Sequence, residues 1–243
     1  MSGVTAHFTD TTAEDFDLII GADGLNSTVR RLVIEDQSSN LYRNGRINLW
    51  VNTPGRLAGG TRAWILMGGG AMAQVFPYPD VDQTLVITTV DTKGERYEVS
   101  ELLPRAAELL RNSGEDFAQL AWGVLSAAPE QARVTPFAQV WAPRWHAKNV
   151  ILVGDAAHCI DPLSGLGAHG ALHGSSILTE ELHRYPSDIS TAAARYARRA
   201  KGFTRPAQLL TAAMIEVATA STLRQYGQAA TFLLSAAAAA CWR

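Results

Sequence analysis

Two short apolar runs, each followed by glycine, do most to constrain the fold of this 243-residue chain. The first lies within residues 17–20 ("DLII") and the second spans residues 150–153 ("VILV"). Each is continuous rather than alternating in hydrophobicity, which is typical of a strand buried on both faces of a parallel sheet. The sequence therefore predicts an α/β domain whose strands come from two distant parts of the chain.

The segment between these runs differs from them in its residue composition and pattern. From about Arg46 to Asp91 it contains four runs rich in β-branched and aromatic residues, "INLWVN", "TRAWILM", "AMAQVFPYP" and "QTLVITTVD", separated by Gly, Pro and Asp. These runs predict an antiparallel sheet, in which the prolines put the third run at an edge or a strand end. A helix is expected over "VSELLPRAAELLRNSG", with Pro104 in its first turn or at a break and Gly114 at its end.

The remaining segments are expected to contain two strands near the N-terminus, an extended stretch and several helices. Residues 4–20 predict strand, turn and strand, after which Ser27 can cap a helix through "TVRRLVI". Residues 133–149 are expected to be irregular or extended. A long helix is expected from about Gly167 to His183, with further helices over residues 189–201 and from Arg205 onward. The basic side chains of this last part are expected to form a solvated face: Arg195, Arg198, Arg199, Lys201 and Arg205.

The order of these elements predicts an α/β protein, α+β overall. We expect a three-layer nucleotide-binding domain that is interrupted by an antiparallel β-sheet domain and followed by C-terminal helices. The expected boundaries are residues 1–45 and 132–183 for the two parts of the first domain, 46–131 for the sheet domain and 184–243 for the helices.

Composition and charge exclude several function classes. The net charge is −2, so the basic footprint of a nucleic-acid-binding protein is missing. The two cysteines form no C-x-x-C spacing, and we expect no metal site. The N-terminus lacks the pattern of a signal peptide, and the most apolar run, residues 229–241, is shorter than the roughly 20 residues of a membrane span. We therefore expect a cytoplasmic protein with a small-molecule partner and no membrane span.

Residues 165–170 ("GLGAHG") fit the G-x-G-x-x-G pattern of a dinucleotide-binding turn. That turn must follow a strand directly, whereas the strand here ends at Gly154 and Pro162 intervenes. We therefore exclude a pyrophosphate-binding turn. Glycines at a helix start still allow a flat or anionic ligand close to the backbone. Asp155 follows the strand where α/β sheets bind ligands, and its alternative role is that of a helix cap.

Two longer segments carry a resemblance to a known family. Residues 154–167 ("GDAAHCIDPLSGLG") resemble the G-D-A-A-H-x-x-x-P-x-x-G-x-G segment of flavoprotein aromatic hydroxylases. These are single-component FAD-dependent monooxygenases, similar to para-hydroxybenzoate hydroxylase and the ubiquinone-biosynthesis hydroxylases. Residues 17–31 ("DLIIGADGLNSTVRR") resemble the D-G-x-x-S-x-x-R signature of the same family. The order of the two segments and the sheet-like stretch between them match as well.

The resemblance implies FAD as the cofactor and NAD(P)H and O2 as co-substrates, with hydroxylation of an aromatic or similar small molecule through a flavin C4a-hydroperoxide. No catalytic side chain is implied, because the cofactor supplies the chemistry. The resemblance places Asp155 at the ribityl chain, and it makes His158 a structural element and Cys159 an inert position. The cofactor-binding residues it implies are Gly154, Asp155, Pro162, Gly165, Leu166, Gly167 and Ala168, with Asp23, Gly24 and Arg30 in the second signature.

By the same resemblance, the substrate would lie between the flavin and the middle sheet. Candidates for its lining are Trp50, Trp64, Phe76 and Tyr78, and plain sheet core is the alternative for each. Two positions depart from the family pattern and are expected to lie beside the flavin. These are His169, where the family often has asparagine, and Gly174, where it often has aspartate.

The family begins with a strand–GxGxxG–helix unit that holds the ADP half of FAD, and this sequence contains no counterpart of it. We therefore expect a truncated or split form, which could form a homodimer or associate with a complementing N-terminal fragment. Two other functions remain open. One is a non-catalytic binding or assembly remnant of the fold, and the other is a flavin-dependent reductase or dehydrogenase.

Overall fold

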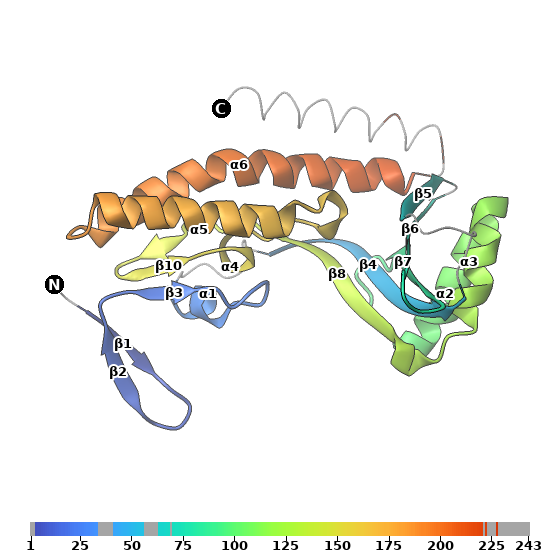
Figure 1. Ribbon diagram of the computed structural model, residues 1–243, viewed down its shortest axis with the longest axis horizontal. Helices are drawn as coiled ribbons and strands as arrows, with labels where there is room; N and C mark the ends of the chain where they lie inside the picture. Colours follow the sequence, from blue (N-terminus) through green and yellow to red (C-terminus); the bar gives the residue numbers. More distant parts are fainter. Residues whose placement is uncertain are drawn as a thin grey trace. The chain divides into compact units, whose positions relative to one another are not determined.

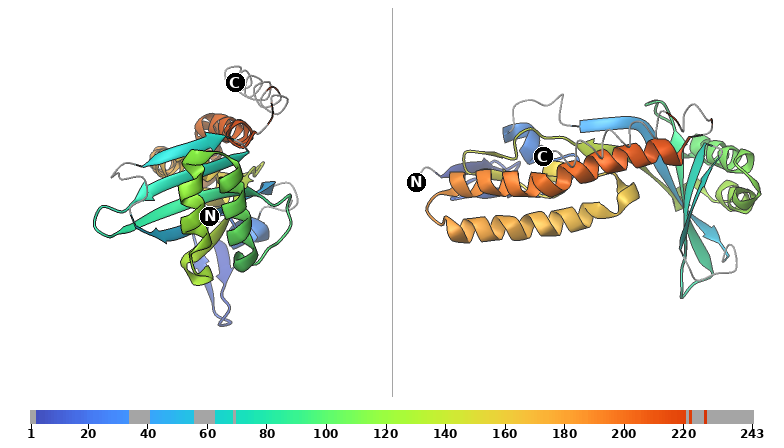
Figure 2. Two further views of the ribbon diagram at one scale, coloured as in Figure 1. Left: turned by 90° about the vertical axis from the view of Figure 1, so that its right-hand side faces the viewer. Right: turned by 90° about the horizontal axis from the view of Figure 1, so that it is seen from above.

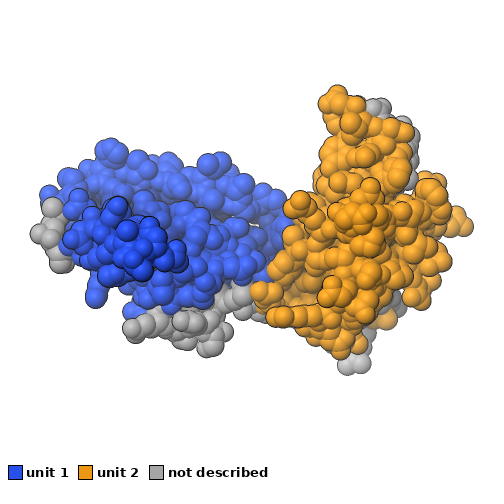
Figure 3. Space-filling view, turned by 90° about the horizontal axis from the view of Figure 1, so that it is seen from below, with its two compact units in different colours: residues 1–42, 138–211, 236–243 blue, residues 43–137, 212–235 orange. Residues whose placement is uncertain are grey.

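The computed structural model describes residues 3–33, 41–55, 63–68, 70–220, 222 and 227. The chain divides into two compact units, which Figure 3 shows in different colours. The first unit comprises the described residues of 1–42 and 138–211, and the second those of 43–137 and 212–235. The second unit therefore interrupts the first along the chain.

The first unit contains the two apolar runs as paired strands. Strand β3 (Ile19–Gly21) lies parallel to β10 (Val150–Leu152), and β9 (His146–Ala147) pairs antiparallel with β10 on its other side. All three residues of β10 are buried, as a continuous apolar run predicts. Burial of β3 on both faces was wrong, since Ile20 is 48% exposed. The strand is at an edge of its sheet among the described residues, and Gly21, on the face opposite Ile20, packs on Val29.

The start of this unit contains three strands, where strand, turn and strand were expected. Strand β1 (Val4–His7) pairs antiparallel with β2 (Ala13–Phe16), and β3 follows as a separate strand. Helix α1 (Thr28–Val33) begins after Ser27, whose Oγ accepts a hydrogen bond from the backbone N–H of Arg30 at 2.9 Å. Ser27 is therefore the helix cap that the sequence indicated.

Helices α5 (Leu166–Arg184) and α6 (Ile189–Ala218) lie side by side, as Figures 1 and 2 show. Four of the five basic side chains expected on a solvated face also make contacts within the unit. Arg195 and Arg199 each bind the Glu181 carboxylate at 2.7 Å. Lys201 donates to the carbonyl of Pro143 and Arg205 to that of Ala142, both at 2.7 Å. These side chains therefore fasten α6 to the rest of the unit.

Helix α6 is continuous through Pro206, where we expected two helices. Proline removes one helical hydrogen bond, but tertiary contacts hold the helix on either side of it. Arg205 precedes the proline and binds Ala142. Gln208 follows it, and its buried amide donates to the carbonyls of Val140 and Cys159 at 2.7 and 2.9 Å.

The second unit is built on a five-stranded sheet with the strand order β5-β6-β7-β4-β8. Its strands are β4 (Leu41–Pro54), β5 (Trp64–Gly68), β6 (Ala71–Pro77), β7 (Gln83–Asp91) and β8 (Ala132–Val140). The four expected runs are thus strands, and the registers of β4 with β7, β5 with β6 and β6 with β7 are antiparallel. The third run, β6, lies inside the sheet, so Pro77 marks its end and not an edge. The segment expected to be irregular or extended contributes β8.

Two helices, α2 (Val99–Asn112) and α3 (Glu115–Leu125), cover one face of this sheet, as the left view of Figure 2 shows. Buried residues that alternate along the strands, among them Leu49, Val51, Val75 and Val86, pack in one cluster with residues of these helices. Helix α2 continues through Pro104, which was expected at a break or in the first turn. The proline lies on the exposed side of the helix, where water can bind the carbonyl that loses its N–H partner.

Short connecting helices complete the structure: α4 (Asp155–His158) follows β10, and single 3₁₀ turns lie at Pro129–Gln131 and Pro162–Ser164. In the part of the chain that the structure describes, no helix combines the length and the apolar character needed to cross a membrane.

Candidate cofactor groove

The first unit contains an open groove of about 650 Å³ whose walls include four glycines and three alanines. It brings together seven of the ten expected cofactor-binding residues, from the turn after β3, the turn after β10 and the start of α5. These are Gly24, Gly154, Asp155, Pro162, Gly165, Gly167 and Ala168. Because four of them are glycines, a flat ligand could approach the backbone closely along much of the groove.

The turn after β10 requires glycine for its geometry. Gly154 precedes α4 with φ 57° and ψ −141°, a combination that L side chains rarely adopt. Asp155 follows at once as the first residue of α4, and within the described residues no side chain caps this helix. The sharp turn puts the Asp155 carboxyl at the carboxyl end of the central strand β10, in the wall of the groove.

A second turn positions the start of α5. Gly165 has φ 66°, in the left-handed region, and its N–H donates to the carbonyl of Pro162 at 3.1 Å. Helix α5 begins at Leu166, and its first turn lines the groove through Gly167 and Ala168. The free N–H groups of a helix start favour negative charge or a polarised carbonyl beside them.

The part of the groove formed further along α5 was not predicted from the sequence. Ala168, Ala171, Leu172 and Ser175 all line it, and their spacing of three and four residues puts them on one helix face. The Leu172 side chain is 75% exposed. The helical spacing from Ala168 onward was the available signal, since a helix that starts in a groove continues to line it on the same face.

The Asp155 carboxyl is accessible to solvent in the groove, yet surrounding protein atoms desolvate it. This desolvation raises the pKa of Asp155, and a hydrogen bond from the Cys159 thiol opposes the rise. The thiol itself is buried, and burial raises the pKa of Cys159 to about 12, helped by Asp155 and Asp161. A thiol with so high a pKa is no nucleophile at neutral pH, which agrees with an inert role for Cys159.

Three expected cofactor residues do not line the groove. Leu166 is at the start of α5 but not in the wall. Asp23 caps α1, since its carboxylate accepts hydrogen bonds from the N–H groups of Thr28 and Val29 at 2.6 and 3.1 Å. Arg30 is buried and donates to the carbonyls of Ala156 and Leu25, both at 2.7 Å. Arg30 therefore ties α1 to the turn that carries Asp155, and cofactor contact by these three residues stays a prediction.

Of the two positions that depart from the family pattern, neither lines the groove. His169 is exposed, with its ring stacked near His173 and edge-on to Phe203. Gly174 is buried on α5 beside His158 and Tyr196. The expectation that both lie beside the flavin stays a prediction.

Replacing Gly174 by alanine should raise the free energy of unfolding by about 1 kcal/mol, because glycine is less favourable than alanine in a helix interior. An added Cβ would meet only ordinary contacts, 3.6 Å from His158 Nε2 and 3.7 Å from Tyr196. Gly202→Ala on α6, where nothing lies within 4 Å, is the matched control. Urea unfolding of the two variants measures the effect, and a destabilised Gly174→Ala beside a stabilised control would show that the site has no room.

The expected substrate-lining residues belong to the second unit. Trp50 on β4 lies opposite Ile87 and donates from Nε1 to Thr135 Oγ1 at 2.7 Å. Phe76 and the Tyr78 side chain are each 36% exposed, and the Tyr78 hydroxyl donates to Asn52 Oδ1 at 3.2 Å. By strand alternation Trp50, Asn52 and Phe76 share the face opposite the helices. The side chain of Trp64 lies outside the described residues.

Comparison with known proteins gives the family of this chain. Residues 1–185 match the FAD binding domain family. The chain is 33% identical over 211 residues to the uncharacterized protein Rv1260 of Mycobacterium tuberculosis (strain ATCC 25618 / H37Rv), covering 85% of this chain and 56% of the relative. It is 27% identical over 216 residues to the FAD-dependent monooxygenase asL6 of Sarocladium schorii, covering 85% and 51%. The chain thus spans about half the length of the curated relatives it matches.

Solved structures show the same fold. Klebsiella pneumoniae HpxO complexed with FAD and uric acid matches with a TM-score of 0.77 at 20% identity, over 96% of this chain and 59% of that one. Pseudomonas aeruginosa PqsL in complex with 2-aminobenzoylacetate matches with a TM-score of 0.71 at 19% identity, over 93% and 62%. The fold is mixed α/β, as expected. Together with the sequence relatives, these findings show that the chain belongs to the FAD binding domain family, which includes FAD-dependent monooxygenases and hydroxylases.

Proposed function

We propose that this chain forms the flavin- and substrate-binding portion of an FAD-dependent monooxygenase, which uses NAD(P)H and O2 to hydroxylate an aromatic or similar small molecule. One observation carries the proposal. The glycine-walled groove joins the end of β10 to the start of α5, and it contains residues of both family signatures. Membership of the FAD binding domain family gives that groove a natural ligand.

The residues of the groove fit a flavin. A Cβ at Gly24, Gly165 or Gly167 would meet nothing within 4 Å, so these positions border open space. A flat ring system could lie there against backbone and against Ala168, while Leu172 covers it from the α5 side. The Asp155 carboxyl would accept hydrogen bonds from the ribityl hydroxyls. Bound FAD would supply the redox and oxygen-activating chemistry.

The protein's own part would be placement and electrostatics. The N-terminal turn of α5 would stabilise negative charge on the pyrimidine side of a bound ring, since helix starts favour anions. The aromatic side chains Trp50, Phe76 and Tyr78 of the second unit, of which Trp50 is half-buried and the other two are exposed, would line the site of the aromatic substrate. The complexes of HpxO with uric acid and of PqsL with 2-aminobenzoylacetate support small ring-containing ligands as the substrate class.

The exposed edge of β3 supports the proposal that another chain segment completes this unit. Ile20 is 48% exposed on an edge strand among the described residues, and such edges invite pairing. A complementing N-terminal segment or a second copy of this chain could pair there. Size-exclusion chromatography with light scattering, with and without a separately expressed segment, distinguishes the two.

Turnover with isotopic oxygen tests the proposal. Purified protein with FAD is given NADH or NADPH, 18O2 and a panel of aromatic acids, and products are analysed by mass spectrometry. We expect 18O in one product, with NAD(P)H oxidation that depends on it. Substrate-dependent NAD(P)H oxidation without 18O incorporation would indicate a reductase or dehydrogenase. Flavin binding with background oxidation on every compound would indicate a non-catalytic remnant.

A further inference from the structure

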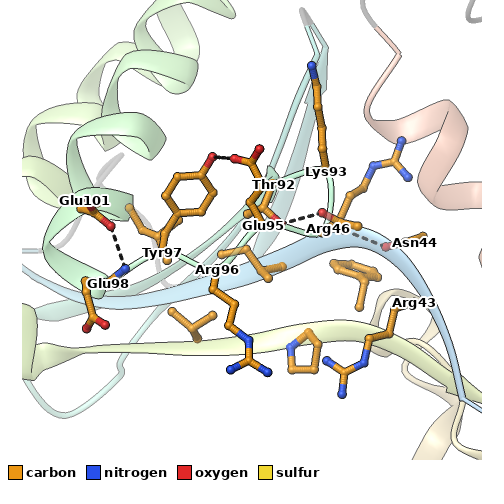
Figure 4. A pocket seen from close by; sticks show the side chains of 17 residues that line it. Arg43, Asn44, Arg46, Thr92, Lys93, Glu95, Arg96, Tyr97, Glu98 and Glu101 are labelled. Carbon is orange, nitrogen blue, oxygen red and sulfur yellow. Dashed lines mark hydrogen bonds between the residues drawn. The ribbon is translucent and has the colours of Figure 1, made fainter.

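The second unit contains its own cavity, separate from the cofactor groove and larger, with a volume of about 1050 Å³. Figure 4 shows it from close by. Its walls come from the start of β4 (residues 43–47), the loop from β7 to α2 (residues 92–98), the first turn of α2 and β8. This volume is large enough for a small organic ligand.

Two arginines at this cavity have no carboxylate partner in the described part of the chain. Arg43 and Arg96 are exposed, and no hydrogen bond or ion pair engages either guanidinium among the described residues. Arg46 differs, because both of its terminal nitrogens bind the Glu216 carboxylate, at 2.6 and 2.9 Å. Arg46 is therefore neutralised within the fold, whereas Arg43 and Arg96 keep their donors for a ligand.

Two of the three carboxylates that line the cavity accept hydrogen bonds from neighbours in the same wall. Glu95 accepts a hydrogen bond from the Tyr97 hydroxyl. Glu101 accepts one from the backbone N–H of Glu98 at 2.9 Å, as part of the cap of α2. Figure 4 shows the guanidinium groups of Arg43 and Arg96 on one side of the cavity and Glu98 and Glu101 on another. The cavity is thus polarised, with a free cationic side.

Apolar residues line the same cavity. Ile47, Leu102, Val134 and Pro136 line the cavity, and Val134 is 39% exposed. An apolar lining with a few convergent polar groups is the usual composition of a small-molecule site. It would receive the body of a ligand whose charged end meets the arginines.

We propose that this cavity binds a small organic anion, with an apolar body on the β8 side and a carboxylate or phosphate group held by Arg43 and Arg96. The planar guanidinium offers paired donors that match both groups, which is why arginine is common where they are recognised. This site goes beyond the proposed monooxygenase function, and it uses none of the residues of the cofactor groove.

Calorimetric titration of the full chain with three probes tests the proposal: benzoate, phenyl phosphate and the neutral benzamide. We expect the anions to bind and benzamide to bind at least about tenfold more weakly, since hydrogen bonds to charged groups are worth about 1.5–3 kcal/mol. Comparing benzoate with phenyl phosphate shows whether the site prefers a carboxylate or a phosphate group. Benzamide binding as tightly as benzoate, or no binding of any probe, would overturn the proposal.

Variants locate the binding. Arg43→Gln with Arg96→Gln should weaken binding of the preferred anion at least about tenfold, since glutamine keeps a polar side chain but carries no charge. Arg133→Gln removes the same charge from β8 next to Val134, outside the cavity lining, and should bind like the wild type. Unchanged binding in the double variant, or equal losses in both proteins, would contradict the assignment. Because titrations run without FAD, failure here leaves the monooxygenase proposal standing.

Discussion

Replacing Asp155 by alanine should weaken FAD binding by about one to two orders of magnitude, because hydrogen bonds to a charged group are worth about 1.5–3 kcal/mol. Asp155 is the carboxylate of the groove wall, directly after the buried strand β10. Titration of flavin fluorescence measures the affinity. Asp155→Asn, which keeps an accepting oxygen, should lose less than the alanine variant.

The fold should survive this change. Desolvation raises the pKa of Asp155, so above that pKa its ionised carboxylate disfavours the folded state and its removal costs no charge stabilisation. Asp17→Ala, an exposed carboxylate outside the groove in the same unit, is the matched control. Equal FAD affinity in Asp155→Ala and Asp17→Ala would show that Asp155 does not contribute to FAD binding.

Acidification from pH 6.5 to pH 4 should cost the wild type about 3 kcal/mol of stability more than it costs a His158→Phe variant. His158 is fully buried, its ring centroid lies 4.8 Å from that of Trp145, and neither ring nitrogen has a hydrogen-bond partner among the described residues. Burial lowers the pKa of His158 to about 4. The unfolded chain therefore takes up a proton below pH 6.5 that the folded chain refuses until about pH 4, and stability falls through this window.

Urea unfolding at several pH values measures the difference. Phenylalanine keeps an aromatic ring against Trp145 and cannot titrate, so other acid-sensitive groups cancel in the comparison. Parallel stability profiles for the two proteins between pH 6.5 and 4 would show that His158 is protonated in the folded state. A buried imidazolium needs a hydrogen-bond acceptor, so such a result would require an internal partner for His158.

Elements with a strong local pattern could be predicted from the sequence. The continuous run at residues 150–152 is the central buried strand, the β-branched runs of residues 46–91 are sheet strands, and the glycine-flanked helix is α5. In each case the hydrophobic pattern and the flanking residues agree with the fold. The residues around Gly154 and Gly165 could also be predicted to come together, because each glycine forms a turn of fixed geometry, one at the end of β10 and one at the start of α5.

Features set by partners distant in sequence could not be predicted. Arg195 and Arg199 appear as a solvated basic stretch until α5 brings Glu181 to them. Helix α6 continues through Pro206 because Gln208 binds carbonyls of β8 and of the segment after α4. The engagement of Arg30 with Ala156 depends on a contact across more than a hundred residues. Local propensity contains no information on such contacts.

Stoichiometric FAD binding by the wild-type chain tests the central proposal most directly. The measurement is a titration of purified protein with FAD, followed by flavin fluorescence and visible absorption, with a thermal melt to show that the protein is folded. The groove between β10 and α5 predicts saturable binding at one FAD per chain, weakened in Asp155→Ala. A folded protein that shows no saturable binding of FAD would contradict it.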